Sequence, residues 1–425
     1  MTRATHAGRR TPLYGWLTAE LVSLCGTRLS MIAIPWLVLT TTDSASLTGL
    51  VGFAEMAPYV LARAGSGPLI DRVGGRRVGV ACDAVSMALV GLVPLLHAAD
   101  ALPLPLLLGL VALIGLFRGP SDAAKHALVP DIVDAAAVPM ERVTGLASAA
   151  ERLAATAGAA LAGVLVAAIG PANALLVDAA SFGVAGLLIA LTAPGRTHTT
   201  ADDPDAALGY VARLRSGWQF LRHDKVLVGI TVMLAITNLL DMAFTVVLVP
   251  VWARQGGYGA ETVGLLFAVF SAASVAGAVL AAAVGHRLPR FLTYLVAFLI
   301  TGAPRFVVLA LDVPLWSVLA VAVAAGFASG FLNPILGAVV FERVPRALMG
   351  RVTSLTTSLC WAGMPLGGVV GGLLVTATGL APALLACGAA YFLATMLPAV
   401  RPEWREIERG RAPSASQPER VPVDG

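Results

Sequence analysis

Charged side chains are scarce in this sequence. Asp, Glu, Lys and Arg make up 13% of the residues, whereas an ordinary soluble domain holds about 25%. With 57% hydrophobic residues, the chain has too few polar groups to form a water-soluble surface. The sequence therefore predicts that this protein is dissolved in the lipid bilayer.

Cysteine and histidine are also rare. The four cysteines form no Cys-x-x-Cys pair, and no histidine cluster has metal-ligand spacing, so we interpret Cys25, Cys82, Cys360 and Cys387 as small core residues. The HExxH, GxSxG and P-loop motifs are absent, and no loop is long enough to fold alone. We therefore expect no metal site, no cofactor and no enzymatic activity.

What the sequence has instead is a series of apolar runs, each long enough to cross a hydrocarbon layer of roughly 30 Å as a helix. The first six lie near 13–41, 46–66, 78–98, 101–123, 145–170 and 173–193. The second six lie near 226–252, 262–284, 291–311, 314–340, 352–376 and 380–400. The first run is too long for a signal peptide and holds Arg28 at its centre. The sequence predicts an all-α membrane protein with twelve transmembrane helices.

Basic residues indicate the orientation of these spans, because they favour the cytoplasmic side of short loops. Of the 29 Lys and Arg residues, five fall inside the spans, Arg254 alone lies in the loops on one side, and the other 23 lie on the opposite side. We expect both termini to be cytoplasmic and the protein to be a monomer in the plasma membrane. Basic residues spread over many short loops do not predict a nucleic-acid partner.

The predicted units are an N-terminal six-helix bundle (1–193), a linker (194–225), a C-terminal six-helix bundle (226–400) and a disordered cytoplasmic tail (401–425). In the linker, apolar residues recur at spacings of three and four, opposite arginines. This pattern is typical of an interfacial amphipathic helix, and a soluble helix packed on a neighbour is the alternative. Its apolar residues are Leu208, Val211, Leu214, Trp218 and Leu221.

The two halves are related in sequence. Residues 142–182 align without gaps on 351–391, with 15 identities in 41 positions. Earlier in each half, a weaker register places Gly49 on Gly264. Parallel repeats of six spans predict a pseudo-twofold axis along the membrane normal and a cavity between the halves. Rocking of the halves about that cavity gives alternating access, so the architecture predicts a transporter of a small molecule.

The loop after the second span reads Gly67-Pro68-Leu69-Ile70-Asp71-Arg72-Val73-Gly74-Gly75-Arg76-Arg77. It resembles the signature of the major facilitator superfamily, G-x-L-x-D-R-x-G-R-R/K, with Gly75 as an extra residue. The resemblance implies the major facilitator fold and a gating loop that latches the outward-facing state through Gly67, Asp71, Arg72 and Arg76. Gly67 is expected to allow close helix approach. Simple anchoring by positive charge at the cytoplasmic face is the alternative.

Two further segments, Ser23-Leu24-Cys25-Gly26 with Ile34-Pro35-Trp36-Leu37-Val38 and Gly217-Trp218-Gln219-Phe220-Leu221-Arg222, resemble the macrolide-efflux and enterobactin-export branch of drug:proton antiporters. The family's antiporter motif in span five, G-P-x-x-G-G, is altered here to Gly158-Ala159-Ala160-Leu161-Ala162-Gly163. The resemblance implies outward transport in exchange for protons.

Charges inside the spans are costly, about 2.5 to 3.5 kcal/mol each on insertion scales, so each should face protein or a wet cavity. We expect Arg28, Glu55, Arg118 and Asp122 to line the cavity, where Arg118 resembles the superfamily's buried span-four arginine. Burial favours the neutral form of a carboxyl, which makes Glu55 and Asp122 the candidate proton carriers. The remaining pathway candidates are Glu151, Arg152, Asp178 and Asp241. For each charge, a structural ion pair is the alternative.

Three other charges, Glu20, Arg63 and Asp83, lie nearer the cytoplasmic ends of their spans, where snorkelling to the interface suffices. The sequence as a whole favours a proton-driven exporter of an amphipathic drug or secondary metabolite. An importer or facilitator of a small solute such as a sugar is the first alternative. A membrane scaffold or sensor that transports nothing is the second.

Overall fold

The structure is a computed structural model that describes residues 3–195, 218–284, 287–345 and 348–401, together with Trp404 and Glu408. Within these residues the chain forms helices and no strand. Twelve segments are long and apolar enough to cross a membrane, which confirms the predicted number of spans. Most of the amphipathic helix predicted in the linker, up to residue 217, and most of the predicted tail lie outside the described residues.

The first six spans are built from α1 (Arg3–Thr42), α2 (Ala45–Gly65), α4 (Gly75–Ala98), α5 (Leu104–Ala127), α7 (Met140–Leu153) with η1 (Ala154–Gly158) and α8 (Ala159–Ile169), and α9 (Pro171–Thr192). Two short helices, α3 (Gly67–Val73) and α6 (Val129–Ala136), follow spans two and four. Apart from the start of α1, the ends agree with the predicted spans to within a few residues.

The second six spans are built from α11 (Lys225–Ala243) with η3 (Phe244–Leu248) and α12 (Val249–Gln255), α13 (Ala260–Val284), α14 (Arg290–Thr301) with α15 (Ala303–Ala310), α16 (Leu315–Ser329) with α17 (Leu332–Arg343), α18 (Met349–Ala362) with α19 (Met364–Thr378), and α20 (Leu380–Val400). Several of these spans are interrupted by proline or glycine, as at Gly302 and Gly363.

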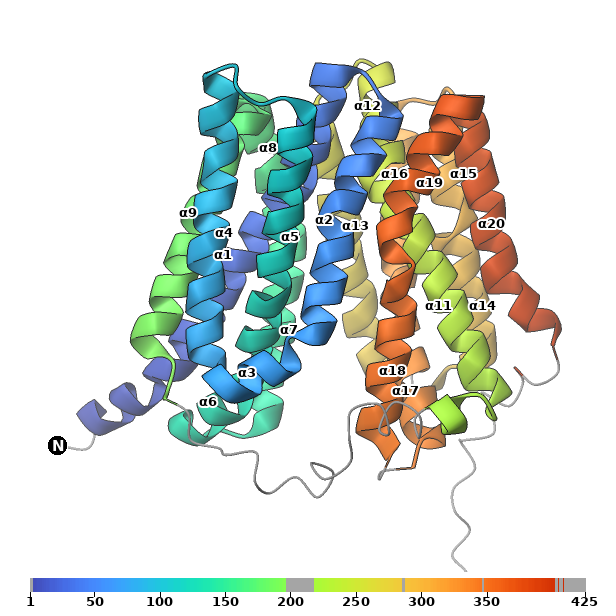
Figure 1. Ribbon diagram of the computed structural model, residues 1–425. Helices are drawn as coiled ribbons and strands as arrows, with labels where there is room; N and C mark the ends of the chain where they lie inside the picture. The colour runs from blue at the N-terminus through green and yellow to red at the C-terminus, as the bar shows by residue number, and fades with distance from the viewer. Residues whose placement is uncertain are drawn as a thin grey trace, which may run out of the picture.

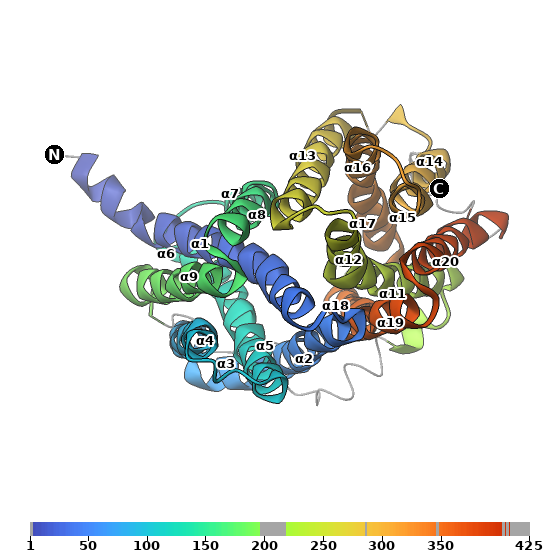
Figure 2. The ribbon, with the colours of Figure 1, turned by 90° about the horizontal axis from the view of Figure 1, so that it is seen from above.

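The spans form two six-helix bundles that stand side by side (Figures 1 and 2). In the first bundle α1 packs on α9 and α2 on α5, and in the second α13 packs on α16 and α15 on α20. The bundles meet along two seams, α2 against α19 and α8 against α13. Many large apolar side chains on the outer surface, such as Leu61 and Leu191, are exposed, as expected for helices whose solvent is lipid.

Glycines bring the backbones into contact along both seams. A Cβ on Gly49 would lie 2.0 Å from the carbonyl oxygen of Gly368, and a Cβ on Gly264 would lie 2.6 Å from that of Ala159. Gly163 likewise contacts Gly264, and Gly372 contacts Ala45. Because the sequence repeat places Gly49 on Gly264 and Gly163 on Gly372, the two seams are related by the same internal symmetry.

Both seams lie toward the end of the bundles that is opposite the N-terminus and the two short helices α3 and α6 (Figure 1). At this far end Arg254, in the last turn of span seven, donates to Asp43, just after span one, with an Nε to Oδ1 distance of 2.8 Å. The two bundles are therefore joined at the far end by close backbone contacts and by an ion pair.

One described residue from the predicted linker helix is informative. Leu221 is buried in a small cluster with Leu227, Val344 and Val352. It packs on protein, at the start of span seven, and does not face a lipid surface. Trp218, three residues earlier, is half-exposed.

Candidate functional site

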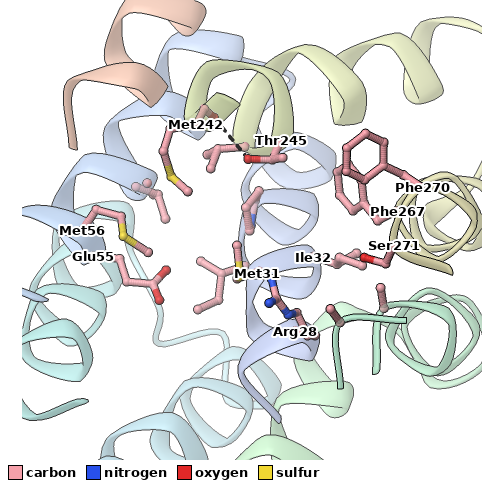
Figure 3. A pocket seen from close by; sticks show the side chains of 17 residues that line it. Arg28, Met31, Ile32, Glu55, Met56, Met242, Thr245, Phe267, Phe270 and Ser271 are labelled. Carbon is pink, nitrogen blue, oxygen red and sulfur yellow. Dashed lines mark hydrogen bonds between the residues drawn. The ribbon is translucent and has the colours of Figure 1, made fainter. Parts of the chain in front are cut away.

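A cavity of about 210 Å³ lies between the two bundles (Figure 3). Its walls come from α1, α2, η1 and α8 of the first bundle and from α11, η3 and α13 of the second. The lining is mostly apolar and contains flexible and aromatic side chains: Met31, Met56, Met242, Phe267 and Phe270. The polar side chains in the lining are those of Arg28, Glu55, Thr245 and Ser271.

Two of the spans that border the cavity contain a π-helical turn. The turn η1 lies in span five and contributes Ala155 to the lining, and η3 lies in span seven and contributes Thr245 and Val246. A π-helical turn interrupts the regular hydrogen-bond ladder of a helix and is frequent at functional sites. The cavity is thus bordered by an irregular turn from each bundle.

Glu55 and Arg118 form a buried ion pair at the cavity wall. The Nη1 of Arg118 donates to Oε1 of Glu55 at 2.7 Å, and each residue is 6% exposed. Glycines allow this pairing, because a Cβ on Gly115 would lie 2.1 Å from the Glu55 carbonyl oxygen, and one on Gly119 2.6 Å from that of Tyr59. The pattern Gly115-x-x-x-Gly119 is the sequence signal that could have predicted the close contact between spans two and four.

The prediction that Arg118 and Asp122 line the cavity is wrong. Glu55 stands between Arg118 and the cavity, since Glu55 is a lining residue and Arg118 is not. Asp122 lies one turn further along α5, where its carboxylate accepts a hydrogen bond from the Tyr59 hydroxyl at 3.0 Å. The guanidinium of Arg63 donates to the same hydroxyl at 2.6 Å and lies 3.7 Å from the Asp122 carboxylate.

Arg63 also connects the bundles. Its guanidinium carbon lies 5.0 Å from the ring centroid of Trp361, which belongs to α18 of the second bundle. Arg63 follows Glu55 by eight residues on α2, so this contact lies on the side of the cavity that is nearer the chain termini. Arg63 is thus held within the molecule by Tyr59, Asp122 and Trp361, and does not only snorkel.

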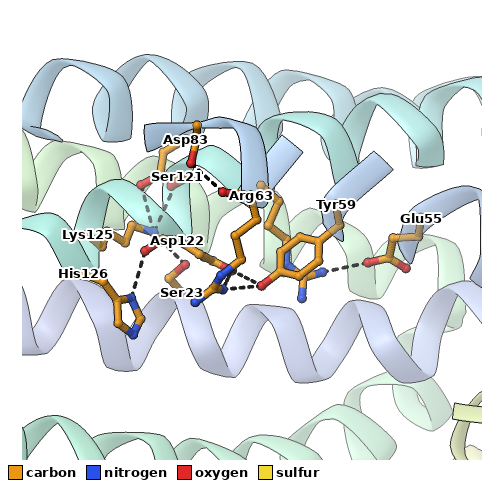
Figure 4. A network of polar contacts seen from close by, with 11 residues as sticks. Ser23, Glu55, Tyr59, Arg63, Asp83, Ser121, Asp122, Lys125 and His126 are labelled. Carbon is orange, nitrogen blue, oxygen red and sulfur yellow. Dashed lines mark hydrogen bonds and ion pairs between the residues drawn. The ribbon is translucent and has the colours of Figure 1, made fainter. Parts of the chain in front are cut away.

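A second buried ion pair was not predicted. Lys125 and Asp83 are 1% and 0% exposed, and their charged atoms lie 3.2 Å apart (Figure 4). The ammonium group also donates to Ser23 at 2.9 Å, and Ser121 donates to Asp83 at 2.5 Å. The prediction that Asp83 snorkels is therefore wrong, and so is the assignment of Lys125 to a cytoplasmic loop, because α5 continues to Ala127.

The helical spacing of Arg118, Ser121, Asp122 and Lys125 is the signal that reasoning from the sequence missed. Residues three, four and seven positions apart share one face of a helix. This face of α5 carries both ion pairs, toward α2 and α4. Trp16 of α1 donates from Nε1 to the Lys125 carbonyl oxygen at 3.0 Å and covers the end of the network.

Asp178 is almost completely buried between α9 and α1. Its carboxylate accepts hydrogen bonds from the hydroxyls of Ser30 and Ser181, and no ion pair with a described residue is present. A Cβ on Gly26 would lie 2.3 Å from this carboxylate, so α1 offers the space that the acid occupies. Cys387, which the repeat aligns with Asp178, is equally buried, so burial alone does not require an acid at this position.

The second bundle holds one intramembrane ion pair among its described residues, between Arg305 and Asp241. The guanidinium of Arg305 lies about 5 Å from the ring centroids of three aromatic residues, Phe244, Phe306 and Tyr391. Asp241 does not line the cavity, although Met242 beside it does. Glu151 and Arg152 are exposed on α7 and are also absent from the lining.

The proposed gating loop packs within the first bundle. Arg76 donates to the carbonyl oxygen of Ala190 on α9, and Asp71 is exposed, with no ion pair to a described residue. Arg72, also exposed, lies next to Asp71 on α3.

The prediction that Gly67 allows close helix approach is wrong, because nothing lies within 4 Å of a Cβ added there. Two later positions in the loop do favour glycine. Gly74 has a φ of +94°, and a Cβ on Gly75 would lie 3.0 Å from the Ala124 carbonyl oxygen. Gly75, the extra residue of the signature, is therefore the one at which α4 approaches α5.

Among the described residues, no group of three or more His, Cys, Asp or Glu side chains is placed to hold a metal ion. The four cysteines are free thiols, and Cys82, Cys360 and Cys387 are buried. The polar groups of the site are thus ion pairs and hydroxyls set in an apolar surrounding.

The chain is similar to known transport proteins over nearly its whole length. A family profile described as "Transmembrane secretion effector" matches residues 5–423. The multidrug efflux pump Tap of Mycobacterium tuberculosis (strain ATCC 25618 / H37Rv) is 30% identical over 406 residues, which cover 94% of this chain and 95% of that protein. Tap of Mycolicibacterium fortuitum is 27% identical, over 95% and 99% of the two chains.

The fold is similar to solved structures of transporters. The crystal structure of a point mutant of the nucleoside transporter NupG superposes with a TM-score of 0.75 at 12% identity, over 91% of this chain and 98% of that one. The inward-facing, unoccupied structure of a bacterial homologue of the human lysosomal transporter Spinster gives a TM-score of 0.68 at 14% identity, over 95% and 97%. At these identities the likeness shows the fold alone.

Proposed function

The chain belongs to the transmembrane secretion effector family of the major facilitator superfamily, and on this premise we propose that it exports an amphipathic drug or secondary metabolite in exchange for protons. The transporter class follows from the family. The direction, the chemistry of the substrate and the coupling ion are the proposal.

The observation that carries the proposal is the composition of the cavity wall. Met31, Met56, Met242, Phe267 and Phe270 offer adaptable apolar surface, which suits binding partners of varied shape. Asn, Gln, Tyr and Trp do not occur among the lining residues, although a sugar site would need such groups to bind hydroxyls. An amphipathic substrate is therefore favoured over a small polar solute.

Alternating access is supported by where the bundles touch. The glycine contacts and the Arg254 to Asp43 ion pair close the far end, away from the N-terminus. If the termini are cytoplasmic, as the distribution of basic residues predicts, the closed end faces outward. Export would then require the seams to separate so that the cavity opens to the outside. In that state Gly67, Asp71, Arg72 and Arg76 would form the latch that the family resemblance implies.

Glu55 is the proposed proton carrier, because it is the acid that both lines the cavity and pairs with a buried cation. With Glu55 ionised, its charge is balanced by Arg118. Protonation of Glu55 from the outside would release Arg118 to its other neighbour, the ring of Tyr59 at 5.2 Å. Asp122 is the second candidate, since Tyr59 and Arg63 connect it to the same region.

The test is accumulation of fluorescent amphipathic dyes, acidic, neutral and basic, in cells that express the protein. Expression should lower the accumulation of at least one dye, and an uncoupler that collapses the proton gradient should restore it. Glu55→Gln should keep the protein in the membrane and lose uphill export, whereas Asp122→Asn should retain it. Export that continues unchanged after the gradient has collapsed would rule out proton antiport.

A further inference from the structure

The two ionisable groups that line the cavity differ in how their charges are balanced. Glu55 lies 2.7 Å from Arg118, so its charge is compensated within the first bundle. Arg28 has no ion pair with any described residue; the contact made by its Nη1 is the sulfur of Met31 at 3.9 Å, and its Nε is buried without a partner. The cavity therefore presents one uncompensated positive charge.

The fold holds Arg28 in this position. The stem of the side chain packs on the π-helical turn η1 at Gly158, where an added Cβ would lie 3.4 Å from Cβ and Cγ of Arg28, which is ordinary van der Waals contact. Figure 3 shows the Arg28 side chain directed into the cavity, beside Met31 and Ile32. The thioether of Met31 is only a weak acceptor for a guanidinium that carries five N–H donors.

No nearby acid of the described chain neutralises Arg28. The charged groups that act on it are Glu151, which is exposed on α7 and forms no ion pair with it, and Arg118, which repels it and is already paired with Glu55. Asp178 packs against the same helix, but its carboxylate is hydrogen-bonded by Ser30 and Ser181. An unpaired charge is costly at this depth of the membrane, so a ligand that supplies an anion gains from pairing with Arg28.

We propose that the cavity selects amphipathic acids, in which a carboxylate, enolate or phenolate pairs with Arg28 and an apolar ring system occupies the methionine and phenylalanine wall. This inference rests on the proposed export function and specifies the substrate class of the same site. An engineered cavity of about 150 Å³ binds benzene. The present cavity, at about 210 Å³, therefore accepts a ring system with an attached acidic group.

The experiment compares three probes with one ring system, 2-naphthoate, 2-naphthamide and 2-naphthylmethylammonium, by calorimetric binding to the purified full-length protein in detergent. The wild-type protein should bind the naphthoate at least about tenfold more tightly than the ammonium probe. Arg28→Gln should abolish this preference, and Arg28→Lys should keep its direction at reduced size, because Lys lacks the bidentate geometry of Arg. Arg142→Gln, at an exposed position outside the cavity, is the matched control and should bind like the wild type.

Thermal unfolding of the same samples separates a loss of binding from a loss of fold. Arg28→Gln should unfold at the same or a higher temperature than the wild type, since it removes an unpaired charge. Three results would overturn the proposal: no binding of the naphthoate, equal or tighter binding of the ammonium probe, or a folded Arg28→Gln protein that still prefers the acid.

Transport of the same probes distinguishes this inference from the proposed function. Export of the ammonium probe but not of the naphthoate would refute the acid selectivity and leave the exporter intact. Selective binding of the naphthoate without export of any probe or dye would support the site and refute the exporter.

Discussion

At the scale of single residues, the first bundle holds most of its intramembrane charges in pairs or among hydroxyls. Glu55 pairs with Arg118, Asp83 with Lys125, and Asp178 with two serines. Breaking a buried pair by removing one partner costs about 3 to 5 kcal/mol, whereas replacing both partners by groups of similar volume is often neutral. The pairs therefore differ from Arg28, whose removal exposes no opposite charge.

The Asp83 to Lys125 pair gives a direct test of this difference. Lys125→Met alone should lower the free energy of unfolding by about 3 to 5 kcal/mol, because the Asp83 carboxylate is left buried without its cation. Asp83→Asn together with Lys125→Met should recover most of the loss, since the amide oxygen still accepts from Ser121. Thermal unfolding in detergent measures both. A double variant no more stable than Lys125→Met would show that the loss of stability does not come from leaving the Asp83 carboxylate unpaired.

Of the charges predicted from the sequence, Arg28 and Glu55 line the cavity, whereas the apolar lining and the pairing of the buried charges were not predicted. Glu55 and Arg118 were both recognised as intramembrane charges, yet their pairing depends on the close approach of two helices at Gly115. Asp83 and Lys125 are 42 positions apart, and each lies close enough to a span end to pass for an interfacial charge. Such pairings are set by tertiary packing, which hydropathy and loop charge do not contain.

At the scale of elements, the helices were predictable because lipid imposes a simple rule. A span must satisfy its own backbone hydrogen bonds and present apolar side chains over about 20 residues, and both requirements can be read locally. The interruptions were not predicted. The π-helical turns η1 and η3 and the short helix α3 lie where tertiary contacts, not hydropathy, determine the backbone.

The glycine seams permit a test at this scale. Gly49→Ala places a methyl group 2.0 Å from the Gly368 carbonyl oxygen, so the two helices must move apart. At a cost of about 1 to 3 kcal/mol for overpacking, the population with a separated seam should rise roughly 5- to 150-fold. The measurement is labelling of Ser271→Cys in the cavity by an impermeant maleimide added to intact cells, in a background without native cysteines. Gly109→Ala, with nothing within 4 Å, is the control and should label like the parent.

If Gly49→Ala labelled no faster than Gly109→Ala, the seam would not be the barrier between the cavity and the outside. Faster labelling in both variants would indicate a general loosening of the bundles and would equally reject the seam as a specific closure.

The contact between Arg63 and Trp361 lies on the side of the cavity nearer the chain termini, opposite the glycine seams. Weakening it should therefore open the cavity toward the termini, whereas weakening a seam opens it toward the far end. A cation–π contact contributes about 0.5 to 2 kcal/mol, and Trp is its best aromatic partner. In the proposed orientation, with cytoplasmic termini, Trp361→Leu should therefore speed labelling of Ser271→Cys by a maleimide added to inside-out vesicles by roughly 2- to 30-fold, and Trp361→Phe by less. Equal labelling of the Leu and Phe variants would exclude a cation–π role for Trp361.

At the scale of the whole molecule, the repeat was the most informative sequence feature. It placed Gly49 on Gly264 and Gly163 on Gly372, and these four glycines join the bundles along two symmetric seams. The symmetry ends at the charges, because Asp178 aligns with Cys387 and both are buried. The duplicated scaffold thus provides two equivalent seams, while the charged residues that line the cavity, Arg28 and Glu55, both belong to the first bundle.

If the two bundles rock as we propose, a covalent link across the far end should stop transport. Asp43 and Arg254 form an ion pair between the bundles there, and Arg290 and Glu342 form one within the second bundle, with atoms 2.7 Å apart. In one variant Asp43 and Arg254 are both replaced by cysteine, and in the other Arg290 and Glu342 are. A bifunctional thiosulfonate reagent, about as long as the two side chains that were removed, should join each cysteine pair. Linking 43 to 254 should abolish export and reduction should restore it, because this end must open to release substrate. Linking 290 to 342 should leave the export rate unchanged, since neither bundle deforms internally during rocking.

An impermeant form of the reagent should reach position 43 from outside intact cells if the termini are cytoplasmic. Full export by the protein linked at 43 and 254 would mean that substrate leaves by a route other than separation of the two seams.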